Sequence, residues 1–132
     1  MLARYAQAVL ARDVDAFVAL YVDDLLVFDM WGSWSLRGID AWRDMAKSWF
    51  GSLGDERVVV RFDDVGGTVA GDLAFGHAIL TYAAHDADGT VLRSLANRVT
   101  LGLRRIDGDW KIAHEHSSAP IDHATKQAIL RR

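Results

Sequence analysis

An aspartate stands at the end of an apolar stretch in residues 25–38, which read LLVFDMWGSWSLRG. Asp29 follows four residues typical of a buried strand, and Met30 and Trp31 come directly after it. A carboxylate in apolar surroundings is unfavourable unless it is paired, hydrogen-bonded or neutralised. Two interpretations therefore stay open. Asp29 either caps the turn before Gly32 or acts as a general base, a role that suits an ionised but incompletely solvated carboxylate.

Histidines form the second group of side chains that could do chemistry. His114 and His116 lie two residues apart in WKIAHEHSS, so we expect them to share a strand face with Ile112. His77 stands alone among apolar residues in AFGHAIL. These imidazoles could transfer protons in a pocket, hold a divalent metal together with Asp29, or simply pack in the core. Because no further ligand follows at a telling spacing, we expect no metal site.

The chain has five tryptophans, which is many for 132 residues. Trp31 and Trp34 follow the aspartate, whereas Trp42 and Trp49 lie seven residues apart in a helical pattern. Aromatic side chains at the mouth and walls of a cavity would suit a small apolar ligand. Trp42 and Trp49 equally suit the packing of one helix face against a sheet.

Composition restricts the classes of function. A chain of 132 residues suits one domain with one core, and its net charge of −3 gives no footprint for nucleic acid. The absence of cysteine excludes disulfides, zinc–thiolate sites and cysteine nucleophiles. No apolar run approaches the ~20 residues of a membrane span, and the N-terminal sequence lacks the cleavage region of a signal peptide. We therefore expect a cytoplasmic protein with neither a nucleic-acid nor a membrane partner.

The first 51 residues read mostly as helices. Apolar spacing predicts an amphipathic helix over 2–12 and a second helix capped by Asp13. A strand over 24–30 and a turn or short strand over 32–38 follow, and Asp40 then opens a third helix. These segments are expected to carry the aspartate and most of the tryptophans.

The remainder reads as strands. Residues 57–65, 72–85, 91–106 and 110–119 are rich in β-branched and aromatic residues, and VGGTVAGD, HDADGT and DGD separate them as hairpin turns. The tail 121–132 is expected to form a short helix. Helices followed by strands predict one α+β domain over 1–132, in which a curved antiparallel sheet wraps over three helices and encloses an apolar pocket.

The order of these elements resembles the nuclear transport factor 2-like superfamily. The ending RVTLGLRRIDGDWKIAHEHSSAP is especially similar to SnoaL-like domains, which often have a histidine before serine on the last strand. The resemblance implies a cone-shaped fold, His116 as the preferred pocket histidine, and a homodimer formed through the outer face of the sheet. This fold carries isomerases, cyclases, hydrolases and non-catalytic modules, so it does not by itself imply an activity.

The N-terminal segment ARYAQAVLARDVDAFVALYVDDLLVFD resembles the opening of ketosteroid isomerases without a gap. The matching elements are ARY, D-x-x-A and Y-x-DD-x-x-V-x-D. By position, the resemblance implies Asp29 as general base, Tyr5 as oxyanion-hole tyrosine, and Tyr21 as a tyrosine that hydrogen-bonds Tyr5. It thus implies a cofactor-independent isomerase or cyclase that acts on a small apolar carbonyl compound.

The sequence departs from ketosteroid isomerases at their second acid. Alignment through RRIDGDWKI puts Gly102 near that place, and residues 91–106 contain no Asp or Glu. Asn97 or a histidine is the candidate replacement. Two alternatives remain open: an epoxide hydrolase-like enzyme that uses Asp29 with Arg98, and a ligand-binding or dimerisation module without turnover.

Overall fold

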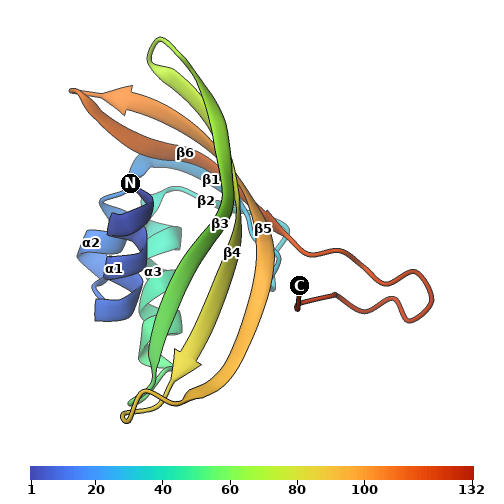
Figure 1. Cartoon of the computed structure of the whole chain (residues 1–132). Helices are drawn as coiled ribbons and strands as arrows, with labels where there is room; N and C mark the ends of the chain where they lie inside the picture. The colour runs from blue at the N-terminus through green and yellow to red at the C-terminus, as the bar shows by residue number, and fades with distance from the viewer.

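The computed structural model describes all residues, 1–132, as three helices and six strands (Figure 1). The helices are α1 (Leu2–Ala11), α2 (Val14–Val18) and α3 (Ile39–Gly51); the strands are β1 (Tyr21–Phe28), β2 (Leu36–Arg37), β3 (Arg57–Ala70), β4 (Leu73–His85), β5 (Val91–Ile106) and β6 (Asp109–Ser118). None of the helices has the length and apolar character that crossing a membrane requires.

The strands form one curved sheet in the order β2-β1-β6-β5-β4-β3. Strands β3 to β6 are joined as antiparallel hairpins, and β1 lies parallel to β6 at the other side. All three helices lie against the concave face (Figure 1). The predicted α+β cone is therefore confirmed, with the parallel β1 making the sheet a mixed one.

The core lies between the helices and the concave face. Phe17 of α2 is fully buried and contacts the rings of Tyr5, Trp42 and Phe50. The strands add alternate apolar side chains, such as Leu80, to the same cluster. This packing fixes α1 and α3 over the sheet and so sets the walls of the space between them.

The helix starts follow local chemistry. The Asp13 side chain accepts a hydrogen bond from the Ala16 N–H at 2.9 Å, which confirms the predicted cap of α2. Helix α3 begins one residue earlier than expected, at Ile39. Gly38 precedes it with φ 83°, a conformation that glycine adopts without steric cost.

The segment VGGTVAGD is not a turn, contrary to the prediction. Strand β3 runs through it to Ala70, interrupted by a bulge that follows Asp63, and only Gly71 begins the turn. A Cβ atom at Gly67 would lie 2.3 Å from the carbonyl oxygen of Phe75. Glycine is needed here because two strands approach closely, not because the chain reverses.

The tail is also not a helix, contrary to the prediction. The Asp122 side chain accepts hydrogen bonds from the backbone N–H groups of two following residues, which favours a turn, and Lys126 has φ 61°. The chain then folds back, and Leu130 accepts a hydrogen bond from the Ala96 N–H at 2.7 Å. The tail thus projects from the side of the sheet opposite the helices, and its end returns to β5 (Figure 1).

Candidate active site

A cavity of about 810 Å³ lies between the concave face of the sheet and α3. Its walls are mainly apolar and aromatic, and they include Phe17, Leu36, Trp42, Met45 and Trp49. Trp42 and Trp49 also pack in or against the core, so both interpretations of this pair hold. The volume suits a small organic molecule with several rings.

Asp29 lies directly after β1, half-buried, and lines this cavity. Its Oδ1 atom accepts hydrogen bonds from the Ser117 hydroxyl at 2.8 Å and from the Met30 N–H at 2.7 Å. Both bonds suit an ionised carboxylate, which is only an acceptor. The carboxyl group is therefore held in one orientation at the edge of an apolar space.

Tyr5 also lines the cavity, but its partner is not the expected one. Its hydroxyl lies 2.9 Å from the hydroxyl of Tyr82 on β4. Tyr21 instead donates a hydrogen bond to Glu115, so the Tyr5–Tyr21 bond implied by the resemblance is wrong. Burial raises the pKa values of Tyr5 and Tyr82 above their ordinary value, which keeps both hydroxyls protonated.

Glu115 is a buried acid in the same cavity, with only 5% of its surface exposed. The Tyr21 hydroxyl donates a hydrogen bond to its Oε2 atom at 2.7 Å. Burial raises the pKa of Glu115 from 4.5 to about 7, against the opposing effect of the Tyr21 bond, and the charge of Asp29 adds to the rise. A substantial fraction of Glu115 therefore carries a proton at neutral pH and can donate a hydrogen bond.

A bulge in β6 turns the predicted pocket histidines away from the cavity. Gly102 pairs with His114 whereas the next residue of β5 pairs with Ile112, so Ala113 is an extra residue. Alternation therefore changes phase: Ile112 and Glu115 face the core, whereas His114 and His116 lie on the outer face. The prediction that the histidines share a face with Ile112 is thus wrong.

The outer histidines have local partners. His114 contacts the Leu26 carbonyl through Nδ1 at 2.8 Å, and both it and His116 pack edge-on against Phe28. His77 also lies outside the cavity, where its ring occupies the space above Gly66. Nowhere in the fold do three His, Asp or Glu side chains gather in a group that could hold a metal ion.

Asn97 and Trp31 are the other predicted site residues, and both line the cavity. Asn97 is 6% exposed, and its Nδ2 group donates a long hydrogen bond of 3.5 Å to Met30 Sδ, while its Oδ1 atom has no partner. Trp31 is 52% exposed at the rim. Arg98 does not line the cavity, which separates it from Asp29.

The cavity lining also includes Glu115, Tyr82, Ser117 and Arg93, none of which was predicted from the sequence as a site residue. Tyr82 could have been predicted, because it lies two residues after Leu80 on β4 and so faces the same side of the sheet. Glu115 and Ser117 could not, because the bulge changes the phase of their strand.

The comparisons with known proteins identify the family. Residues 1–122 match the SnoaL-like domain, and the chain therefore belongs to the SnoaL-like domain family. An NTF2-like protein of unknown function from Pseudomonas putida KT2440 is 30% identical, with a TM-score of 0.83; the match covers 98% of this chain and 88% of that one. No curated protein matches the sequence.

More distant solved structures share the fold. The protein Aln2 from a Streptomyces species is 19% identical, with a TM-score of 0.78 over 89% of this chain and 83% of that one. An NTF2-like protein with a cystatin-like fold from Novosphingobium aromaticivorans is 19% identical, with a TM-score of 0.77 over 95% and 80% of the two chains. The SnoaL-like family belongs to a superfamily that includes isomerases and cyclases, and the structural neighbours define the fold alone.

Proposed function

We propose that this protein is a cofactor-independent enzyme of the ketosteroid isomerase or cyclase type. In the proposed reaction, a proton moves next to the carbonyl group of a small apolar molecule. One observation carries the proposal: the Asp29 carboxylate and the partly protonated Glu115 share an apolar cavity with a pair of tyrosine hydroxyls. Two carboxyl groups in different environments suit a division into base and acid.

Each group has a defined part in the proposed reaction. Asp29 takes a proton from the carbon next to the carbonyl, and the electron pair of that C–H bond moves toward the carbonyl oxygen to form an enolate. In the Tyr5–Tyr82 pair one hydroxyl donates to the other, which leaves the second proton free for the enolate oxygen. Protonated Glu115 replaces the second acid that residues 91–106 lack. Asp29 then returns the proton to carbon.

The Ser117 hydroxyl has a positioning role in this scheme. It donates a hydrogen bond to Asp29 Oδ1. Asp29 can therefore accept the substrate proton on its other oxygen, Oδ2, without losing this bond. A base held in one orientation raises the fraction of bound substrate that can react.

The test is hydrogen–deuterium exchange next to the carbonyl group. A panel of apolar ketones of one to four rings is incubated with the protein in D₂O, and deuterium uptake is followed by NMR. Asp29→Asn should lower the catalysed rate by about 10²- to 10⁴-fold, the usual contribution of a general base. Its melting temperature should stay unchanged, because asparagine keeps an acceptor for Ser117.

Asp23→Asn is the matched control, because Asp23 is exposed on β1, the strand that leads to Asp29, and does not line the cavity. It should leave the exchange rate unchanged. A rate for Asp29→Asn equal to that of the wild type would contradict the role of Asp29. If the wild type accelerates exchange of none of the ketones, the result contradicts the proposal and favours a ligand-binding module without turnover.

A further inference from the structure

The mouth of the cavity contains one basic side chain. Arg93, on β5, is the only Lys, Arg or His among the residues that line the cavity. The lining has two carboxyl groups, those of Asp29 and Glu115. Arg93 pairs with Ala84 near the end of β4, whereas Ser117, which holds Asp29, pairs with Val99, so the cation and the Asp29 carboxylate lie at different places along the sheet.

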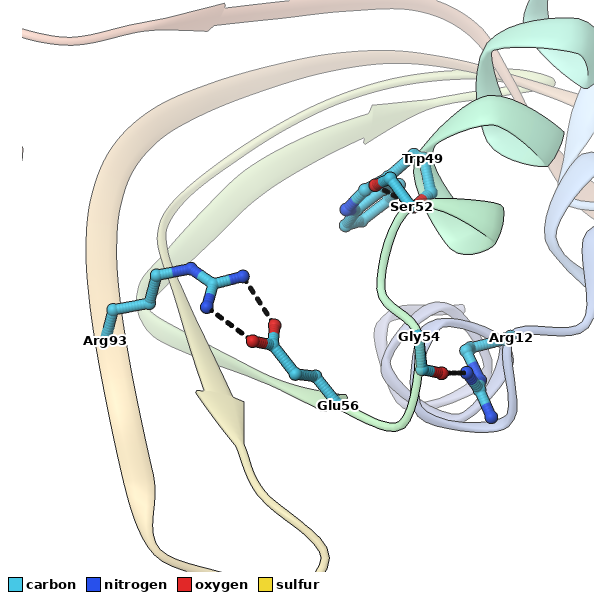
Figure 2. A network of polar contacts seen from close by, with 6 residues as sticks. All are labelled: Arg12, Trp49, Ser52, Gly54, Glu56 and Arg93. Atoms are coloured by element: carbon cyan, nitrogen blue, oxygen red, sulfur yellow. Dashed lines mark hydrogen bonds and ion pairs between the residues drawn. The ribbon is translucent and has the colours of Figure 1, made fainter.

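Arg93 already holds a carboxylate. Its Nη1 and Nη2 atoms donate hydrogen bonds to Glu56 Oε1 and Oε2, at 2.8 and 2.5 Å. Figure 2 shows this bidentate pair between β5 and the residue that precedes β3. The geometry is the one that a planar carboxylate adopts with a guanidinium group. Trp49 and Ser52, at the end of α3, line the same cavity as Arg93.

The ion pair is also exchangeable. The Arg93 side chain is 61% exposed and that of Glu56 is 27% exposed, so water reaches both groups. Exposed ion pairs contribute little to stability, and exchanging one carboxylate for another keeps the same hydrogen bonds. A carboxylate on a ligand could therefore replace Glu56 without unfavourable desolvation.

We propose that the ligand of this cavity is an apolar carboxylic acid whose carboxylate binds Arg93 in place of Glu56. This inference rests on the proposed function, because it places the carbonyl end of the same molecule near Asp29. Repulsion between the ligand carboxylate and the Asp29 carboxylate orients the molecule with its charge away from Asp29 and next to Arg93.

The test uses matched pairs of ligands that differ only in charge. Carboxylic acids of naphthalene, phenanthrene and a 3-oxosteroid are each compared with the corresponding primary amide by isothermal titration calorimetry. The wild type should bind at least one acid about tenfold more tightly than its amide, as expected for a charge-assisted two-pronged contact. Arg93→Gln should abolish this preference.

The direction in which Glu56→Gln changes the affinity for the acid distinguishes the proposal from a purely structural ion pair. Because it removes the competing carboxylate, it should increase the affinity for the acid severalfold and leave the affinity for the amide unchanged. A purely structural ion pair predicts instead that the Arg93 and Glu56 variants change binding in the same direction. Arg61→Gln is the control, because Arg61 pairs with Asp63 away from the cavity, and it should bind like the wild type.

Equal affinities for acids and amides, or no binding of any acid, would overturn the inference. The result is separable from the proposed function when the titrations are repeated with Asp29→Asn. If Asp29→Asn still catalyses hydrogen–deuterium exchange and still prefers acids to amides, Asp29 is not the base but the ligand is a carboxylic acid. If Asp29→Asn loses hydrogen–deuterium exchange but the wild type does not prefer acids to amides, the carboxylic-acid proposal fails and the proposed base is retained.

Discussion

Glu115 illustrates how one side chain acquires its chemistry from its surroundings. In the sequence it stands between two histidines and would ordinarily be an exposed, ionised glutamate. In the fold its neighbours are the Tyr21 hydroxyl and the apolar floor of the cavity, and its pKa rises to about 7. A carboxyl group that is partly protonated near neutral pH can act as a hydrogen-bond donor, whereas its surface counterparts cannot.

This pKa predicts a pH dependence of stability. The folded value of about 7 lies above the ordinary 4.5, so the folded protein binds more protons than the unfolded chain between these values. The resulting stabilisation is complete below the lower value and is lost as the pH rises through the upper one. Over this range the free energy of unfolding should fall by on the order of 3 kcal/mol. Glu115→Gln, which keeps an acceptor for Tyr21, should flatten the curve.

Urea unfolding of the wild type and the variant across this pH range measures the effect. Glu56→Gln is a suitable control, because Glu56 has its pKa lowered by Arg93 and should not contribute to this decrease. An identical pH slope in the wild type and in Glu115→Gln would show that Glu115 is not the titrating group. The proposed donor role also predicts that activity decreases above neutral pH.

At the scale of elements, the sequence predicts where strands and helices lie better than which side chains face inward. The periodicity of apolar residues located α1 and the Asp13 cap, and it gave β5 its observed bounds, because these depend on local interactions. The extra residue Ala113 depends on the pairing of β6 with β5, which no local pattern records. Asp29 and Tyr5, which lie before this bulge in the chain, line the cavity, whereas the histidines that follow it lie on the outer face.

The close approach of β3 and β4 gives a prediction at the same scale. Gly67→Ala forces a Cβ atom against a backbone carbonyl of Phe75, which cannot move away as a flexible side chain would. We expect a loss of roughly 1–3 kcal/mol in the free energy of unfolding, typical of overpacking. Gly51→Ala, at the end of α3 with free space around it, should be neutral or slightly stabilising. Chemical denaturation measures the free energy of unfolding of both variants, and equal values for Gly67→Ala and Gly51→Ala would contradict the prediction.

At the scale of the whole molecule, the outer face of the sheet is the side that no helix covers (Figure 1). It carries exposed apolar side chains, among them Phe75 at 52%, Val59 at 42% and Phe28 at 39% exposure. We propose that two copies of the chain pack through this face, as the superfamily resemblance implies. Burial of such side chains is what stabilises association between subunits.

Sedimentation velocity tests this arrangement. The wild type should sediment as a dimer, and Phe75→Glu should shift it toward monomer because the carboxylate would be buried at the interface. Trp34→Glu is the matched control, because Trp34 is 98% exposed in the loop near the cavity and not on the sheet. A monomeric wild type, or equal dissociation of both variants, would contradict the proposed interface.

The bulge at Ala113 has a consequence for how this scaffold diversifies during evolution. The residues after it contain two alternative linings, one of carboxyl and hydroxyl groups and one of imidazoles, and the phase of the strand selects the first. In a homologue with the same sequence here but without the bulge, His114 and His116 would face the cavity and Glu115 would face outward. Catalytic roles can therefore be assigned from an alignment of this family for residues before Ala113. For residues after it, the assignment also requires the strand pairing to be known.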